Sequence, residues 1–213
     1  MPRPYRLKRR AARQEETKLR IVDATVALHG ELGPARTTIS AIAERAGVQR
    51  HTVYRYFPEE SEIFRACASR FLSLHPPPDP HAWLVIADPV ERLRTGLAAA
   101  YAYFRENEAM MASVLRDAEI MSVGGGFLRH RAAMAEVLAK GWNHLEQHPK
   151  IRAAIGLAVT FQIWRTLIRD QGLDDQQAVE LMTDMVQCAA ARLGAETSGP
   201  EERRVKKAEG TTD

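Results

Sequence analysis

Apolar residues recur along this chain at the three- and four-residue spacing of α-helices, and sustained residue-by-residue alternation, typical of half-buried strands, is absent. The pattern predicts an all-α protein of about nine helices. A first helix is expected to carry an apolar face made of Leu19, Val22 and Val26 together with Ile21, Thr25, Leu28 and Leu32. Gly33-Pro34 ends this helix, because glycine accepts a left-handed backbone and proline cannot continue a helix.

Two short helices are predicted next, separated by a tight turn. The first follows Thr38, whose hydroxyl can accept a free backbone N–H of the first helical turn. Gly47 permits the turn, and the second short helix runs near Gln49 to Tyr54. Pro58 then opens a fourth helix that continues to Leu74.

The segment from His75 to Pro80, HPPPDP, cannot be helical and marks a boundary between two domains. Beyond it, Asp88-Pro89 with Glu91 is typical of a helix start. Later helices are expected at about 110–119, 128–146, 151–169 and, with Asp174 as the cap, up to Gly194. The expected organisation is a basic flexible arm (1–15), a three-helix domain with a linking helix (16–75), a second helical domain (80–194) and a polar, disordered tail (195–213).

Positive charge gathers at the N-terminus, although the net charge of the whole chain is only +3. Residues 1–57 hold 12 basic and 5 acidic residues, a net charge of +7, which leaves −4 for the remainder. A basic first quarter on a mildly acidic body favours contact with a polyanion by that part alone. Charge by itself leaves open the alternative that the arm from Arg3 to Arg13 is only a solvated tail.

Several classes of protein are disfavoured by what the chain lacks. No apolar run approaches the roughly 18 residues of a membrane span, and none follows the basic N-terminus as in a secretory signal. Cys67 and Cys188 lack the paired spacing of a zinc site or a disulfide framework, which favours a reducing cytoplasm. His144 and His148 are four residues apart but have no acidic or cysteine partner. We therefore expect a cytoplasmic protein without metal, cofactor or membrane association.

The most informative stretch is TTISAIAERAGVQRHTVYRYF, residues 37–57. Its apolar positions face inward on both short helices, and its small alanines let the helices approach closely. Polar side chains are left outside, where a helix of this size fits the major groove of DNA. Residues expected to reach base edges or phosphates are Gln49, Arg50, His51, Thr52 and Arg55, and hydroxyls suited to phosphates are those of Thr38 and Tyr54.

The same stretch resembles the TetR family of bacterial regulators. The resemblance rests on Thr37-Thr38, Ile42-Ala43, Ala46-Gly47-Val48, Thr52-Val53-Tyr54 and Tyr56-Phe57, and it covers about residues 18–65, nearly a third of the chain. It implies a helix-turn-helix DNA-binding domain followed by a helical ligand-binding and dimerisation domain. It further implies a homodimer through the last two helices, a palindromic operator in double-stranded DNA, and repression relieved by a small-molecule effector. An enzyme is not expected.

Two positions depart from the resemblance. His51 stands where many members have a small residue, so contacts at the groove should differ. Glu60 stands where many members have a lysine that meets a phosphate, so that contact should be absent. The positive charge of the basic arm could replace this contact. The arm either lies in the minor groove or is a disordered solubilising tail, and both interpretations are open.

Aromatic and methionine residues are dense in the second domain, where they either line a ligand cavity or form plain core. Polar residues among them are the better indicators of a cavity. The candidate ligand-binding residues are Trp83, Tyr101, Phe104, Met111, Asp117, Trp142, His144, Phe161, Gln162, Trp164 and Arg165. Coupling to DNA binding is expected through the fourth helix, interpreted as the one direct link between the domains.

Apolar stripes on the last two predicted helices leave a further choice open. Val179, Met182, Val186, Ala189 and Leu193 form a stripe on the last helix, and the helix before it carries a similar one. One stripe belongs to the core and another to a dimer surface, and the pattern alone cannot separate them. Rival functions are a transcriptional activator or non-ligand-responsive DNA-binding protein of the same fold, and an enzyme, for which no catalytic constellation is found.

Overall fold

The computed structural model describes residues 4–121, 125–142 and 145–197. Within these ranges the chain is helical and contains no strand, as the apolar spacing predicted. The chain divides into two compact units: unit 1 is Met1–Pro77 with Asn107–Gly125, and unit 2 is Pro78–Glu106 with Gly126–Asp213. The first crossing between the units lies within the HPPPDP segment, but the chain crosses between them three times.

Unit 1 is built around the second half of one long helix. Its elements are α1 (Pro4–Glu31), η1 (Pro34–Arg36), α2 (Ile39–Ala46), α3 (Arg50–Tyr56), α4 (Glu60–Leu74) and α6 (Glu108–Met121). The core lies between α1, α2, α3 and α4, where Ile21, Ile42, Val53 and Ile63 are at most 2% exposed. These are the inward positions that the helical spacing predicted for the N-terminal domain.

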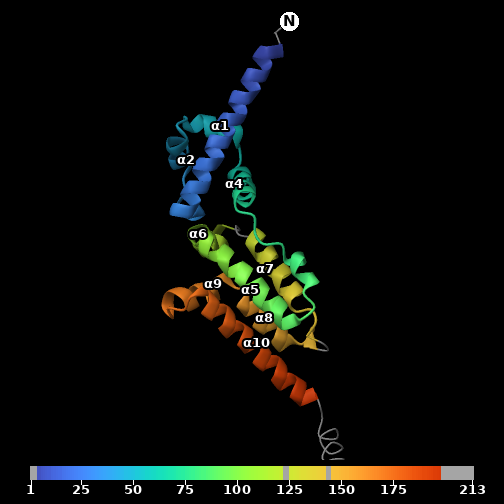
Figure 1. Cartoon of the computed structure of the whole chain (residues 1–213). Helices are drawn as coiled ribbons and strands as arrows, with labels where there is room; N and C mark the ends of the chain where they lie inside the picture. Colours follow the sequence, from blue (N-terminus) through green and yellow to red (C-terminus); the bar gives the residue numbers. More distant parts are fainter. Residues whose placement is uncertain (1–3, 122–124, 143–144, 198–213) are drawn as a thin grey trace, which may run out of the picture. The chain divides into compact units, whose positions relative to one another are not determined.

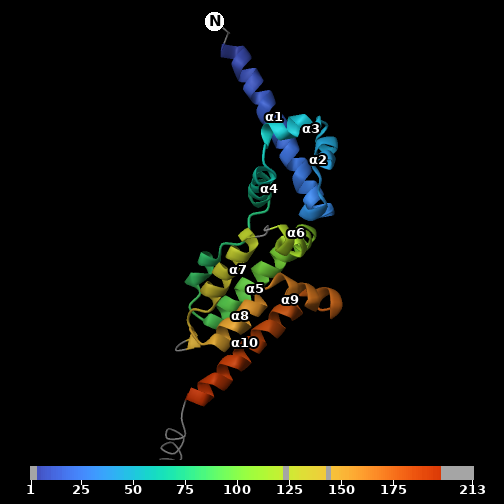
Figure 2. The same ribbon diagram turned by 180° about the vertical axis from the view of Figure 1, so that it is seen from behind.

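Residues 4–15 form a helix and not the flexible arm that the sequence led us to expect. From Pro4 onward the chain is part of α1, which extends past α2 and α3 (Figures 1 and 2). Proline at the first helical position is compatible with a helix, and the next 25 residues contain neither proline nor glycine. Arginine, lysine, alanine, glutamine and glutamate, which dominate here, all have high helix propensity.

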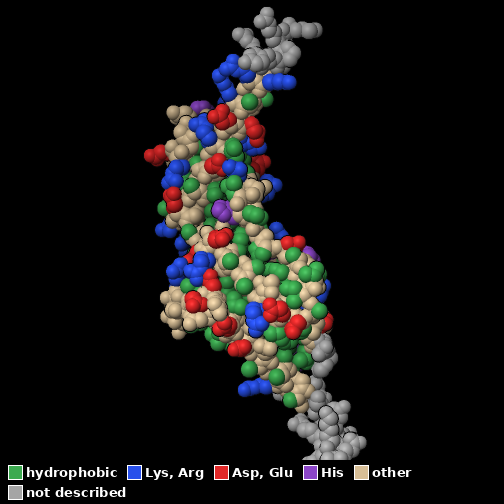
Figure 3. All heavy atoms as spheres, in the orientation of Figure 1, with side chains coloured by type: hydrophobic (Ala, Val, Ile, Leu, Met, Phe, Trp, Pro, Cys, Tyr) green, Lys and Arg blue, Asp and Glu red, His purple; other side chains and the backbone are tan. Residues whose placement is uncertain are grey.

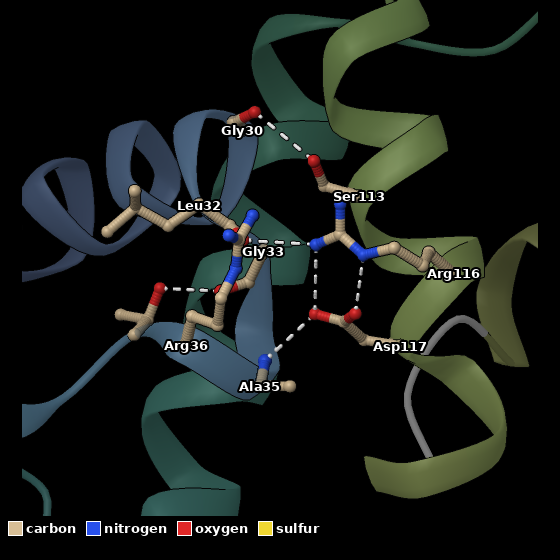
Figure 4. Close-up of polar contacts among 9 residues, drawn as sticks. Gly30, Leu32, Gly33, Ala35, Arg36, Ser113, Arg116 and Asp117 are labelled. Carbon is tan, nitrogen blue, oxygen red and sulfur yellow. Dashed lines mark hydrogen bonds and ion pairs between the residues drawn. The ribbon is translucent and has the colours of Figure 1, made fainter.

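Helix α6 was predicted in the second domain but packs within unit 1, against α1 and η1. A set of hydrogen bonds holds it there (Figure 4). Asp117 accepts from the Ala35 N–H at 2.9 Å, Arg116 donates to the Leu32 carbonyl at 3.0 Å, and Ser113 donates to the Gly30 carbonyl at 3.3 Å. The bond from Arg116 to the Asp117 carboxylate holds the pKa of Asp117 below its usual range.

Unit 2 is a helical bundle. Its elements are η2 (Pro80–Val85), α5 (Pro89–Glu106), α7 (Gly125–Leu138), α8 (Pro149–Ala158), α9 (Phe161–Arg165), η4 (Thr166–Asp170) and α10 (Asp175–Thr197). Helix α10 packs along α5 and α8. The predicted helix starts are confirmed: Asp88 accepts from the Val90 and Glu91 N–H groups, and Asp174 and Gln177 exchange hydrogen bonds.

Two predicted helices of this unit are shorter than expected. The helix expected over 128–146 ends at Leu138. The guanidinium of Arg92 donates a hydrogen bond to the Lys140 carbonyl at 2.6 Å, and Gly141 turns the chain with a φ of +82°. The helix expected over 151–169 is broken after Ala158. The backbone carbonyl of Ala158 accepts a hydrogen bond from the Tyr101 hydroxyl at 2.9 Å. In an unbroken helix this carbonyl would instead accept from a backbone N–H of the next turn.

The exposed fractions of its side chains distinguish the buried side of α10 from its outer side. Val179, Met182, Val186 and Leu193 are at most 5% exposed and belong to the core. Leu181 and Met185, on the other side of α10, are exposed, as is Leu157 on α8. The helix continues three residues past Gly194, where it was expected to end. The rest of the tail that we expected to be disordered, 198–213, lies outside the described residues.

No single helix in the described ranges is long and apolar enough to cross a membrane. The pair Pro149–Ala158 and Phe161–Asp170, bent by 55° between its parts, meets the length and composition requirement only when taken together.

Candidate nucleic-acid interface

The geometry of the α2–α3 pair follows from two local signals. Thr38 caps α2, its hydroxyl accepting from the Ala41 N–H at 3.2 Å. Gly47 has a φ of +65°, which only glycine adopts without strain, and the next N–H, of Val48, donates to the Ala43 carbonyl at 2.9 Å. The left-handed Gly47 therefore ends α2 and reverses the chain, and α3 begins three residues later at Arg50.

Helix α3 is anchored by its apolar side and presents its polar side outward. Val53 is fully buried and Phe57, directly after the helix, is 5% exposed. The predicted contact residues that lie exposed on or beside α3 are Gln49, Arg50, His51, Tyr54 and Arg55, and Thr38 is exposed at the start of α2. Thr52 alone is half-buried. The helix contains no acidic residue, so its outer face is suited to a polyanion.

Neighbouring arginines are engaged within unit 1. Arg45 forms a two-pronged ion pair with Glu31, at 2.7 and 2.9 Å, which holds the pKa of that carboxyl below its usual range. Arg20 of α1 donates to the carbonyl of Ala46 at 3.3 Å, the last residue of α2. Sequence reasoning missed this contact, because nothing in the local pattern distinguishes Arg20 from a solvated arginine.

The candidate ligand-binding residues fall into different places. In unit 2, Phe104, Phe161 and Trp164 form one aromatic cluster with ring centroids 5.5–5.8 Å apart. Tyr101 is adjacent to Phe104 and fully buried. Of the remaining candidates in this unit, Trp83 and Trp142 are buried, whereas Gln162 and Arg165 are exposed.

Met111 and Asp117 lie on α6 in unit 1, where Asp117 bonds Ala35. His144 lies outside the described residues. The ligand-binding role of the whole set stays a prediction. Within the described ranges, no three His, Cys, Asp or Glu side chains gather in a way that could hold a metal ion.

Comparison with known proteins matches the region that contains these helices. Residues 21–67 match the family described as bacterial regulatory proteins, tetR family. The chain is 40% identical over 57 residues to the HTH-type transcriptional repressor KstR of Rhodococcus jostii (strain RHA1). That match spans 27% of this chain and 27% of the KstR chain, so the chain covers about a quarter of this relative's length.

Solved structures extend the likeness in fold over most of the chain. A tetR-family transcriptional regulator from Streptomyces coelicolor aligns with a TM-score of 0.58 and 16% identity, over 91% of this chain and 96% of its own. A TetR-like transcriptional regulator from Rhodococcus sp. RHA1 aligns with a TM-score of 0.57 and 19% identity, over 82% and 96%. The family comprises regulatory proteins, in agreement with the expectation of a non-enzymatic chain. The resemblance found in the sequence is confirmed over residues 21–67, which match the TetR family and contain the helix-turn-helix.

Proposed function

We propose that the chain is a transcriptional repressor that binds a near-palindromic DNA site as a homodimer. The supporting observation is the α2–α3 pair, whose outer face presents Arg50, His51 and Arg55 to solvent inside the segment that matches the family. A two-fold dimer places two such helices on successive major grooves, so its symmetry should appear in the DNA. The repressor role rests on the KstR proteins, which carry that description.

Selection of bound duplexes from a random pool, followed by footprinting, tests this proposal directly. We expect a palindromic motif with half-sites about one helical turn apart. Protected sites scattered without a shared motif would instead favour a nonspecific structural binder, and recruitment of transcription at the selected site would favour an activator.

Arg50 and Tyr54 should have separable roles in binding. Arg50→Ala should weaken operator binding by about 1–3 kcal/mol and relax base preference at one position, if its guanidinium reads a guanine edge. Tyr54→Phe removes only a hydroxyl, so it should weaken binding to all sequences by a smaller amount. Titrations against the selected site and single-base variants measure both effects. Equal losses that do not depend on sequence would contradict this division of roles.

The proposed dimer surface is the outer side of α8 and α10. Leu157 and Met185 are both 54% exposed there, although the opposite sides of the two helices are buried. An apolar surface on these helices is suited to contact with a second copy of the chain, since burying an exposed leucine or methionine lowers the free energy.

Met185→Lys should raise the dissociation constant of the dimer by at least about tenfold, or 1.4 kcal/mol, since a two-fold interface loses the side chain twice. Leu128→Glu, which changes an exposed apolar residue on α7, is the matched control. Analytical ultracentrifugation across a micromolar concentration series measures the shift. A monomeric wild-type protein, or equal effects of the two variants, would exclude this surface.

Relief of repression is proposed to follow binding of a small apolar or amphipathic molecule to unit 2. The supporting feature is its content of aromatic residues, including all three tryptophans of the chain, Trp83, Trp142 and Trp164. Such a molecule releases DNA only if it prefers a conformation that binds DNA poorly. A thermal-shift screen followed by DNA titration with each hit tests this step, and hits that leave DNA affinity unchanged would contradict it.

A further inference from the structure

The N-terminal half of α1 stands free of the core of unit 1. Every residue from Lys8 to Glu16 is exposed, and burial begins only at Ile21. Figure 3 shows lysine and arginine side chains, in blue, along this projecting segment. A helix that buries nothing over these turns contributes little to the core, so its sequence is free to serve another contact.

The arginines of this segment are aligned with the helix-turn-helix. At 100° per residue, Arg13 lies within about 20° of Arg20, and Arg9 within about 20° of Arg20 on the other side. Arg20 donates to the carbonyl of Ala46, at the end of α2, so the direction of this face is fixed by a contact. Arg9, Arg13 and Arg20 thus form one stripe, which we call the arginine stripe.

Acidic residues weaken this stripe only at its edge. Glu16 lies about 40° from Arg20 around the helix, whereas Glu15 lies on the opposite side. Along the axis, a rise of about 1.5 Å per residue places Arg13 about 10 Å and Arg9 about 16 Å from Arg20. The stripe therefore extends the positive surface beyond the α2–α3 turn by several nucleotide steps.

The width of a helix restricts how this segment can meet DNA. An α-helix with its side chains is about 10–12 Å across, whereas the minor groove of B-DNA is about 6 Å wide. The segment cannot enter the minor groove as an extended arm does. Its guanidinium groups can instead reach phosphates from outside the duplex, where fixed charges neutralise the backbone without reading bases.

We propose that the N-terminal half of α1 is a rigid clamp whose arginine stripe binds phosphates flanking the site read by α3. This inference rests on the proposed DNA-binding function and adds to it a second contact surface. The stripe raises affinity and salt dependence for every sequence and leaves base preference to α3.

Two substitutions that each remove one positive charge from the segment test the alignment. Arg13→Gln removes a charge from the stripe, and Lys8→Gln removes one from the side of α1 turned about 140° away from Arg13. Arg13→Gln should make the slope of log K against log salt shallower by about 0.9 and weaken binding about eightfold at 0.1 M salt. Lys8→Gln should stay within about twofold of wild type.

A third variant tests rigidity while keeping every charge. Ala12→Pro breaks the helix between Arg9 and Arg13, since proline removes the N–H and clashes with the carbonyl four residues earlier. It should weaken binding several-fold without changing the melting temperature, because residues 8–16 bury nothing. On a duplex trimmed to the base pairs that the Arg13→Gln variant still protects, wild type and Arg13→Gln should bind equally.

The outcomes separate this inference from the function on which it rests. Equal effects of Arg13→Gln and Lys8→Gln would mean that the segment acts only through its total charge, and would contradict a specific role of the arginine stripe. Full affinity in Ala12→Pro would overturn the rigid clamp. In either case, sequence-specific binding that is lost in Arg50→Ala would leave the proposed function intact. A wild-type protein that binds no DNA would overturn both.

Discussion

Replacing Trp164 with alanine should lower the free energy of unfolding of unit 2 by about 3–5 kcal/mol, the range for large aromatic residues in cores. The side chain is fully buried and packs against Phe104 and Phe161. Its indole N–H donates to the Asp175 carboxylate at 2.9 Å, and Arg105 pairs with the same carboxylate. The substitution removes the ring contacts and one of these two bonds.

The experiment can follow unit 2 by itself, because all three tryptophans of the chain belong to it. Denaturant titration monitored by the fluorescence of Trp83 and Trp142 measures the loss in Trp164→Ala. Gln162→Ala, an exposed position on the same short helix, is the control and should change stability by no more than about 0.5 kcal/mol. A loss below about 1 kcal/mol for Trp164→Ala would contradict the interpretation of this side chain as part of the core of unit 2.

Acidification from pH 6.5 to pH 4 should destabilise unit 1 by up to about 3 kcal/mol through one residue, His29. Burial lowers the pKa of His29 from 6.5 to about 4, although the charge of Asp117 raises it in part. Each pKa unit corresponds to about 1.36 kcal/mol. Between these pH values the unfolded chain binds the proton and the folded chain does not, so stability rises with pH and falls on acidification.

The surroundings of His29 explain why it stays neutral. It is 3% exposed, its ring lies 5.3 Å from that of Phe64, and its Nδ1 is 3.3 Å from the sulfur of Cys67. Burial raises the pKa of the Cys67 thiol to about 12, so the thiol keeps its proton and can donate it in a hydrogen bond to Nδ1. Protonation of the imidazole would place a charge in this apolar site.

Thermal unfolding followed by far-UV circular dichroism from pH 4 to 7 measures the effect, and tryptophan fluorescence in parallel reports unit 2 separately. His29→Gln should flatten the pH profile of unit 1. The slope should persist in His51→Gln, which changes an exposed histidine of the same unit. An NMR titration that gives His29 a midpoint near 6.5 in the folded protein would contradict the prediction.

The sequence predicted the helix-turn-helix well because its signals act within a few residues. The Thr38 cap and the left-handed Gly47 each depend on neighbours no more than four positions away. The same is true of the Asp88 and Asp174 caps in unit 2. The match to the tetR family also falls on this stretch.

Long-range contacts decided the features that the sequence could not predict. Helix α6 follows α5 in the chain, yet Asp117 and Arg116 bond Ala35 and Leu32, more than 80 residues away. The fourth helix is therefore not the one chain connection between the units, as the sequence-based coupling hypothesis assumed. The Tyr101 hydroxyl similarly breaks the helix expected over 151–169 from 57 positions away.

The sequence by itself determined that the chain is helical, where most helices begin, and that α3 offers a basic outer face, because period, caps and turns are properties of neighbouring residues. The tertiary structure alone decided that the side of α10 with Val179, Met182 and Val186 is core and that Leu181 and Met185 remain exposed, since only the packing partners α5 and α8 distinguish the two sides. It also decided that Arg20 is bound to Ala46 and thereby which way the arginine stripe faces, because a solvated and a bonded arginine look identical in a sequence.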